Sequence, residues 1–214
     1  MPPSPDLIDI SRPLSAGTAC WPGDVPFSFR LGWKIADGAS VNVGAIETSV
    51  HTATHCDAPF HFDDAGATVD AIPLDVFVGP CWVVDVRDCL DNWERKLTWH
   101  HAFTPRILFR TSRWPETARF PDRIPSMTTD FVFRLWKDGI KLVGVDLPSV
   151  DPLDSKTLDV HHAHRRHGIT NLERLWLEDV PEGRYELNAL PLRIAGADGS
   201  PVRAVLRTTP GTGR

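Results

Sequence analysis

Short apolar runs, separated by turns rich in proline and glycine, are the main pattern along this chain. Runs of this length that are rich in Val, Ile, Leu and Phe are typical of β-strands. The predicted strands are residues 7–10, 41–50, 81–86, 107–111, 141–146, 192–194 and 202–206. The run 141–146 (KLVGVD) is almost entirely apolar, which is the pattern of a strand covered on both faces. A turn is expected at residues 196–201, between the last two strands.

Two segments have the pattern of helices. Residues 127–138 carry an apolar stripe, follow a region of Ser and Thr that can cap a helix, and end at Gly139. Residues 154–167 contain no Gly or Pro, and Asp154 or Ser155 is the expected cap. A helix that precedes a buried strand is the arrangement of an α/β layer, so an α/β fold is predicted.

Length and composition bound the possible functions. The 214 residues, 42% of them hydrophobic and 24% charged, fit a single globular domain over residues 1–214. A net charge of −5 provides no attraction to nucleic acid or to an anionic membrane, so neither partner is expected. No apolar run approaches the length of a membrane span.

The cysteines and the first residues bear on location. Four cysteines show no paired short spacing of the structural zinc kind, and residues 1–15 lack the apolar centre of a signal peptide. A cytoplasmic protein with free thiols is therefore predicted. Cys56 is expected to be a small buried residue.

The densest chemistry lies in residues 49–61 (SVHTATHCDAPFH). His51, His55, Asp57 and His61 fall within eleven residues, and imidazole and carboxylate are the ligands that a hydrolytic divalent metal prefers. All four positions share parity, but a straight strand of that length would span roughly 33 Å, so the segment must bend. We interpret it as a strand end that curls into a loop and as half of a metal site. Surface or core histidines are the alternative, because His-x-x-x-His alone is a weak motif.

The second half of the site is predicted in and after the segment 154–167. His161 and His162 point about 100° apart on a helix, so at most one can face a given metal, and the spacing leaves the choice open. Glu173 stands among apolar residues, where a carboxylate needs a cation, a metal or a proton partner. Glu173 is thus the best carboxylate to join one of these histidines.

Three further residues have two interpretations each. Trp21 precedes a Pro-Gly turn, and the residues alone favour core packing over a role in lining a pocket for an aromatic substrate. Asp146 and Asp151 flank the turn at Pro148, and carboxylates that form the turn are the simpler explanation there.

The motif HTATHCDAPFH resembles the H-x-G-T-H-x-D-x-P-x-H signature of the metal-dependent cyclase hydrolase family and, within it, the bacterial kynurenine formamidases. The resemblance extends over nearly the whole chain, through WPGD (21–24), VNVG (41–44), IPL (72–74), VGVDLPSVDP (143–152), DSKTLD (154–159) and Leu172-Glu173. One departure is Ala53, where the signature has Gly. A positive φ at this position would strain Ala, and we expect a small residue to suffice.

The resemblance implies a swivelling β/α/β fold with a mixed sheet, a homodimer and two zinc ions, with manganese as the other candidate. It implies that His51, His55 and Asp57 hold one zinc, and that Asp57 bridges to a second held by His161 and Glu173. It further implies that His61 is the acid–base residue, and that Trp21 contacts the substrate.

The implied reaction is hydrolysis of N-formyl-L-kynurenine to L-kynurenine and formate, in tryptophan breakdown, with a small aromatic formamide as substrate. One alternative is a related amidohydrolase acting on another cyclic or aryl amide such as isatin. The other is a metal-binding protein without turnover. Structural zinc sites favour Cys and close the fourth position, so the carboxylates here favour a catalytic site.

Overall fold

A computed structural model describes residues 6–98, 101, 104–115 and 118–208. The helices within these residues are α1 (Thr129–Lys137) and α2 (Asp159–His167). The strands are β1 (Leu7–Asp9), β2 (Ser28–Trp33), β3 (Val43–Glu47), β4 (His55–Asp57), β5 (Val78–Asp85), β6 (Arg106–Arg110), β7 (Leu142–Val145), β8 (Thr170–Glu173), β9 (Gly183–Asn188), β10 (Gly199–Pro201) and β11 (Val205–Thr208).

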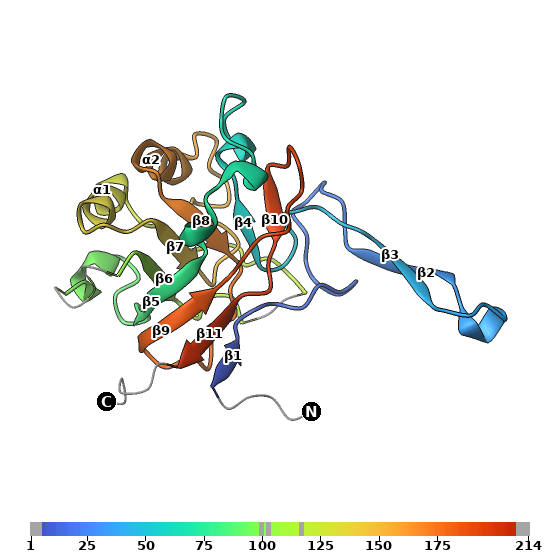
Figure 1. Ribbon diagram of the computed structural model, residues 1–214. Coiled ribbons are helices and arrows are strands. Elements are labelled where there is room, and N and C mark those ends of the chain that lie inside the picture. The colour runs from blue at the N-terminus through green and yellow to red at the C-terminus, as the bar shows by residue number, and fades with distance from the viewer. Residues whose placement is uncertain (1–5, 99–100, 102–103, 116–117, 209–214) are drawn as a thin grey trace.

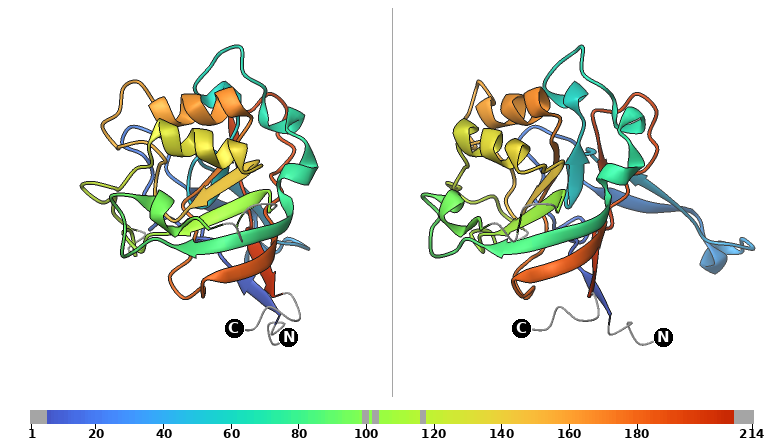
Figure 2. Two further views of the ribbon diagram at one scale, coloured as in Figure 1. Left: turned by 90° about the vertical axis from the view of Figure 1, so that its left-hand side faces the viewer. Right: turned by 60° about the vertical axis from the view of Figure 1, so that its left-hand side comes forward.

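Nine of the strands in the described residues form one curled sheet in the order β1-β11-β9-β5-β6-β7-β8-β4-β10 (Figure 1). The central pairs β5–β6, β6–β7 and β7–β8 are parallel, and the remaining pairs are antiparallel. Helices α1 and α2 lie side by side on one face of this sheet (Figure 2). The predicted α/β fold with a mixed sheet is confirmed.

Two apolar clusters cover the two faces of the central strands. Val84, Ile107 and Val143 belong to the cluster beneath the helices, whereas the neighbouring Val83 and Leu108 belong to the cluster inside the curl of the sheet. Successive side chains in a strand point to opposite faces, so these strands must be apolar at consecutive positions. All four residues of β7 are buried, as the run 141–146 predicted.

The two predicted helices differ in how they begin. Helix α1 begins as expected, because the Thr128 hydroxyl accepts a hydrogen bond from Phe131 N at 3.1 Å. The prediction that the second helix begins near Asp154 is wrong, since α2 starts only at Asp159. Its first amides are capped from outside the segment: the Asp151 carboxylate accepts hydrogen bonds from Val160 N and His161 N, both at 3.0 Å.

Strands with a weak hydrophobic pattern were predicted less accurately than the central strands. The predicted strand 41–50 is shorter in the structure and pairs with β2 in a hairpin that extends away from the sheet (Figure 1). No strand forms at residues 192–194, and the predicted turn 196–201 contains the edge strand β10. Strands β2, β8 and β9 were not predicted. Neither of the α-helices that the structure describes is long and apolar enough to cross a membrane.

Candidate metal-binding active site

Antiparallel pairing of β4 with β8 brings the first three candidate ligands together. The register places His55 directly opposite Glu173, and Asp57 lies two residues along β4, so all three side chains share one side of the sheet. His55 Nε2 lies 3.3 Å from Asp57 Oδ1 and 3.7 Å from Glu173 Oε2. All three side chains are buried. Two segments more than 110 residues apart in the chain thus converge as the sequence analysis predicted.

Helix α2 adds His161 to this group and leaves His162 outside. His161 Nε2 lies 3.5 Å from Asp57 Oδ2 and 3.5 Å from Glu173 Oε1. Its Nδ1 lies 2.6 Å from Asp151 Oδ2, whereas His162 is exposed. Asp151 is therefore not the turn former that the sequence suggested, because it is buried and orients both the ring of His161 and the first turn of α2. A carboxylate behind a histidine ligand is a recurrent support in metal sites.

The remaining histidines of the motif lie at the outer edge of the same site. His51 Nδ1 is 3.0 Å from Asp57 Oδ1, and His51 Nε2 is 2.8 Å from Asp198 Oδ2. His61, at the end of a 3₁₀ turn from Pro59, places Nδ1 at 3.3 Å from the same oxygen of Asp198. The rings of His51 and His61 lie against each other, with centroids 3.9 Å apart.

The bend between His51 and His55 depends on Ala53. Ala53 has a φ of 57°, in the left-handed region that favours glycine, so the departure from the family signature falls on a position that requires this conformation. Its carbonyl oxygen lies 2.9 Å from His55 Nδ1, which must therefore carry the proton. Nε2 of His55 is thereby free to face Asp57 and Glu173. The predicted bend in the motif is confirmed.

The donor set fits divalent metal ions. His51, Asp57 and His61 each offer a ligand atom within 4.8 Å of one another, and so do His55, Asp57 and Glu173. Asp57 belongs to both groups, and its buried Oδ2 has no hydrogen-bond partner within the described part of the chain. A buried carboxylate oxygen without a donor is costly unless a cation faces it. The other contacts of the site are explained without an ion, but the unpaired Oδ2 of Asp57 favours a bound cation.

The histidines of the site and Asp57 shift each other's pKa. Burial would lower the pKa of His51, but its hydrogen bonds to Asp198 and Asp57 outweigh this and raise the pKa to about 10. Burial likewise opposes the charge of Asp57, yet the adjacent imidazoles of His161, His51 and His55 hold its pKa well below the ordinary value. A metal ion beside Asp57 would supply the positive charge that these imidazoles otherwise provide, because histidine ligands bind metal in their neutral form.

A cavity of about 280 Å³ opens onto these residues, and Trp21 stands on its wall. Trp21 is 37% exposed, and its ring meets Phe120 edge-on at a centroid distance of 5.3 Å. The preference from the residues alone for core packing is therefore wrong. Arg174 also lines the cavity and donates to the Ala19 carbonyl at 2.9 Å, which ties the loop carrying Trp21 to the end of β8.

Sequence reasoning missed Asp198 and misjudged Asp151. Asp198 follows Gly196 and Ala197 in a segment that looked like a plain surface turn. Nothing in its local pattern signals a contact with His51, which is 147 positions away. Asp146 also differs from expectation: it is buried and accepts hydrogen bonds from Thr111 and Ser112 on the neighbouring strand end.

Comparisons with known proteins agree with this geometry. A family model described as "Putative cyclase" matches residues 8–152. This chain belongs to that cyclase family. A kynurenine formamidase of Bacillus cereus is 48% identical over 203 residues, which cover 94% of this chain and 97% of that protein. A kynurenine formamidase of Bacillus anthracis is 47% identical over 94% of this chain and 96% of its own length.

Solved structures of the cyclase family have the same fold. A potential metal-dependent hydrolase with cyclase activity superposes with a TM-score of 0.77 at 29% identity, covering 95% of this chain and 98% of the other. Isatin hydrolase A from Ralstonia solanacearum gives a TM-score of 0.77 at 26% identity, covering 95% and 92%. The convergence of motif, helix and β8 therefore occurs in a fold shared with metal-dependent hydrolases.

Proposed function

We propose that this protein hydrolyses N-formyl-L-kynurenine to L-kynurenine and formate at a binuclear metal site. The observation that carries the proposal is the meeting of His55, Asp57, His161 and Glu173 in one buried cluster beside a cavity walled by Trp21. Kynurenine formamidases at 47–48% identity along almost the full chain support the choice of substrate.

The two oxygens of Asp57 face different partners, which supports its role as a bridge. Oδ1 faces His51 and His55, and Oδ2 faces His161. We therefore assign His51, His55 and Asp57 to one ion, and Asp57, His161 and Glu173 to the other. Three imidazoles and two carboxylates suit zinc, and manganese remains the second candidate. When bound, such ions would activate a water nucleophile and polarise the formyl oxygen.

The chain itself supplies the proton chemistry and the substrate contacts. The arylamine leaving group needs a proton, and an imidazole titrates in the right range to deliver one. His61 lines the cavity and is half-exposed, so we assign this role to it. Trp21 would lie against the aromatic ring of the substrate, with Phe120 fixing its orientation.

Two other functions compete with this one. The fold shared with isatin hydrolase A makes a cyclic aryl amide the second candidate substrate, because the same ligands would serve both reactions. A metal-binding protein without turnover is the third, but a closed structural site would not need a cavity with an aromatic wall. Substrate preference separates the first two functions, and turnover separates both from the third.

In the decisive experiment, a chelator removes bound metal from the protein and Zn²⁺ or Mn²⁺ is added back. Hydrolysis of N-formyl-L-kynurenine and of isatin is measured at each stage. We expect formamidase activity to disappear on chelation and to return with metal, and isatin to be the poorer substrate. Faster turnover of isatin would favour the cyclic amide. Metal uptake without turnover of either compound would make the site structural.

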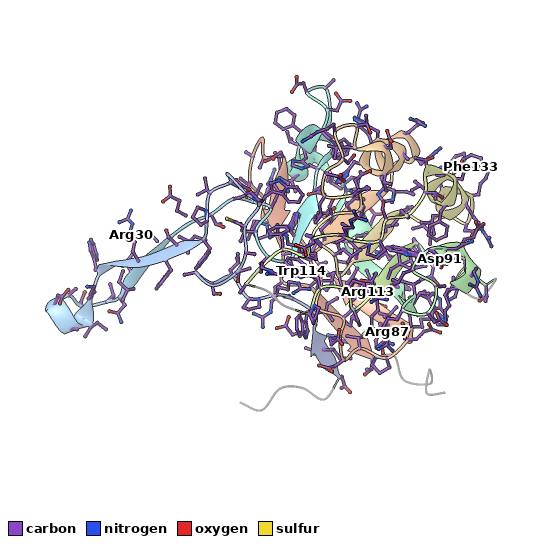
Figure 3. All side chains as sticks on the ribbon, turned by 180° about the vertical axis from the view of Figure 1, so that it is seen from behind. Arg30, Arg87, Asp91, Arg113, Trp114 and Phe133 are labelled. Atoms are coloured by element: carbon purple, nitrogen blue, oxygen red, sulfur yellow. The ribbon has the colours of Figure 1, made fainter. Side chains whose placement is uncertain are left out.

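We also propose that the protein is a homodimer, on the strength of the arm formed by β2 and β3. Every residue of these two strands is exposed, including large apolar side chains such as Phe29, Trp33 and Ile46, which are 59–63% exposed. Figure 3 shows the arm, marked by Arg30, standing clear of the sheet. An extended apolar hairpin is stable only when another surface covers it, and a second copy of the chain is the simplest cover. Light scattering on the wild type and on Trp33→Ser tests this, and a monomeric wild type would refute it.

The proposed location is the cytoplasm. Cys20, Cys56, Cys81 and Cys89 are all free thiols, and three of them are buried. Free thiols are typical of reducing compartments. Burial raises the pKa of Cys56 to about 12, so this thiol inside the motif is kept protonated and inert in the metal-free chain.

A further inference from the structure

We propose that Asp198 is a positioning residue, which holds the ring of His61 so that its Nε2 faces the substrate. The inference rests on the proposed function, because it gives His61 the proton transfer described above. Asp198 does not line the cavity, so it would act through His61 and not by contact with the reacting atoms.

The contacts of a single carboxylate oxygen carry the argument. Asp198 Oδ2 lies 3.3 Å from His61 Nδ1 and 2.8 Å from His51 Nε2. A carboxylate only accepts hydrogen bonds, so the Nδ1 of His61 must carry the proton for this contact to form. His61 Nε2, which has no hydrogen-bond partner among the described residues, is then the ring atom left to exchange a proton with substrate.

The backbone around Asp198 holds it in this place. The Asp198 carbonyl accepts a hydrogen bond from Ala58 N at 2.8 Å. The preceding carbonyl, of Ala197, accepts one from Val69 N at 2.9 Å. Both bonds tie the segment to the chain on either side of the 3₁₀ turn that ends at His61. Asp198 therefore moves together with the histidine that it orients.

Gly199 adds a steric constraint on the other histidine. A Cβ built on Gly199 would stand 2.8 Å from the Cε1 atom of His51 and 2.8 Å from the Cys56 carbonyl oxygen, closer than real contacts allow. His51 thus packs directly on this backbone, which fixes the edge that it turns toward Asp198. Asp198 therefore contacts both rings, and Gly199 leaves room for the ring of His51.

The test compares zinc-loaded wild type, Asp198→Asn and Asp198→Glu by metal content, kcat and KM for N-formyl-L-kynurenine. Asn keeps the size of the side chain but loses the charge that fixes the Nδ1 proton. We expect about 10- to 100-fold lower kcat per bound metal in Asp198→Asn, the range found when the carboxylate that supports a histidine of a metal site is removed, with KM little changed. Asp198→Glu, which restores the charge, should recover part of the loss.

A double-mutant comparison with His61→Ala separates positioning from a general structural effect. If Asp198 acts through His61, Asp198→Asn should cost little further activity once His61 is removed. An equal additional loss in the His61→Ala background would overturn the proposal. So would a loss of activity that merely follows a loss of metal.

Asp70→Asn is the matched control. Asp70 Oδ1 accepts a hydrogen bond from Gly196 N at 3.1 Å, so it anchors the same segment without touching either histidine. Its activity should stay near that of the wild type. An equal loss in this control would attribute the effect to the loop and refute the role of Asp198.

A readout without turnover distinguishes failure of this inference from failure of the proposed function. The ring-nitrogen NMR shifts of His61, assigned by their absence in His61→Ala, report which nitrogen carries the proton in the zinc-loaded protein. Asp198→Asn should convert one dominant tautomer into a mixture. An unchanged spectrum in Asp198→Asn would overturn the inference. If the spectrum changes in this variant but the wild type hydrolyses no formamide, only the proposed function is refuted.

Discussion

The inner and outer parts of the site differ in how much water reaches them. The inner cluster comprises His55, Asp57, His161 and Glu173, whose side chains are 2–5% exposed. The outer cluster comprises His51, His61 and Asp198, whose side chains are 15%, 35% and 40% exposed. Two strands and a helix hold the inner cluster, and turns and an edge segment hold the outer one.

Under the proposed function, this difference separates the buried ion-binding groups from His61, the group proposed to move protons. Buried carboxylates have strong electrostatic interactions and pay a large desolvation cost, so they suit the permanent binding of cations. A half-exposed imidazole can exchange protons with water and substrate during each turnover. His51, which contacts Asp57 on one side and Asp198 on the other, links the two clusters.

The largest effect is expected at the centre of the inner cluster. Asp57→Ala should lose both metals and reduce turnover to background, because both groups of ligand atoms share this carboxylate. Metal analysis of the purified variant, beside an Asp64→Ala control in an exposed loop, checks this. A variant that keeps both ions would rule out the bridge and with it the distinction between the clusters.

His61→Ala should reduce turnover without the loss of metal expected for Asp57→Ala, since His61 lies in the outer cluster. We expect near-normal metal content and a kcat about 10²- to 10⁴-fold lower, the range for loss of a general acid or base. Metal content and kcat measured on the same preparation test this. Loss of one ion would instead make His61 a ligand, as its distance to His51 and Asp57 also allows.

Asp151→Asn tests the support behind the inner cluster. The change removes the charge that orients His161 Nδ1 and weakens the cap of α2. Metal affinity should fall about 10- to 100-fold. Competition with a chelator measures this, and Asp154→Asn, in the stretch that the sequence wrongly assigned as the cap, is the control. Equal affinities in both variants would contradict a supporting role for Asp151.

Trp21→Ala should have the smallest effect. It removes one aromatic contact of about 0.5–1.5 kcal/mol, so KM should rise roughly two- to tenfold while metal content stays unchanged. Trp21→Phe, which keeps a flat ring, should lie between the two. Steady-state kinetics decide, and an unchanged KM would remove Trp21 from the substrate site.

The strands and helices that the sequence predicted well share a strong local signal. Helix α1 has a capping Thr128 and an apolar stripe, and β7 is apolar throughout because both of its faces are covered. Strand β10 (Gly199–Pro201) has no such signal, since a short edge strand is defined by its pairing with β4 and not by its composition. Helix α2 began late for a related reason: its cap, Asp151, lies outside the helical segment.

By itself the sequence predicted most of the groups that meet at the site, since His51, His55, Asp57 and His61 occupy one short motif, and Glu173 is a carboxylate among apolar residues. Only the tertiary structure decided how these groups meet. The β4–β8 register sets Glu173 against His55, and α2 turns His161 inward and His162 outward. Asp198 joined the site only through folding, because β10 brings it beside a histidine 147 positions earlier. Local patterns record which atoms can bind, but long-range strand pairing fixes which of them come within reach.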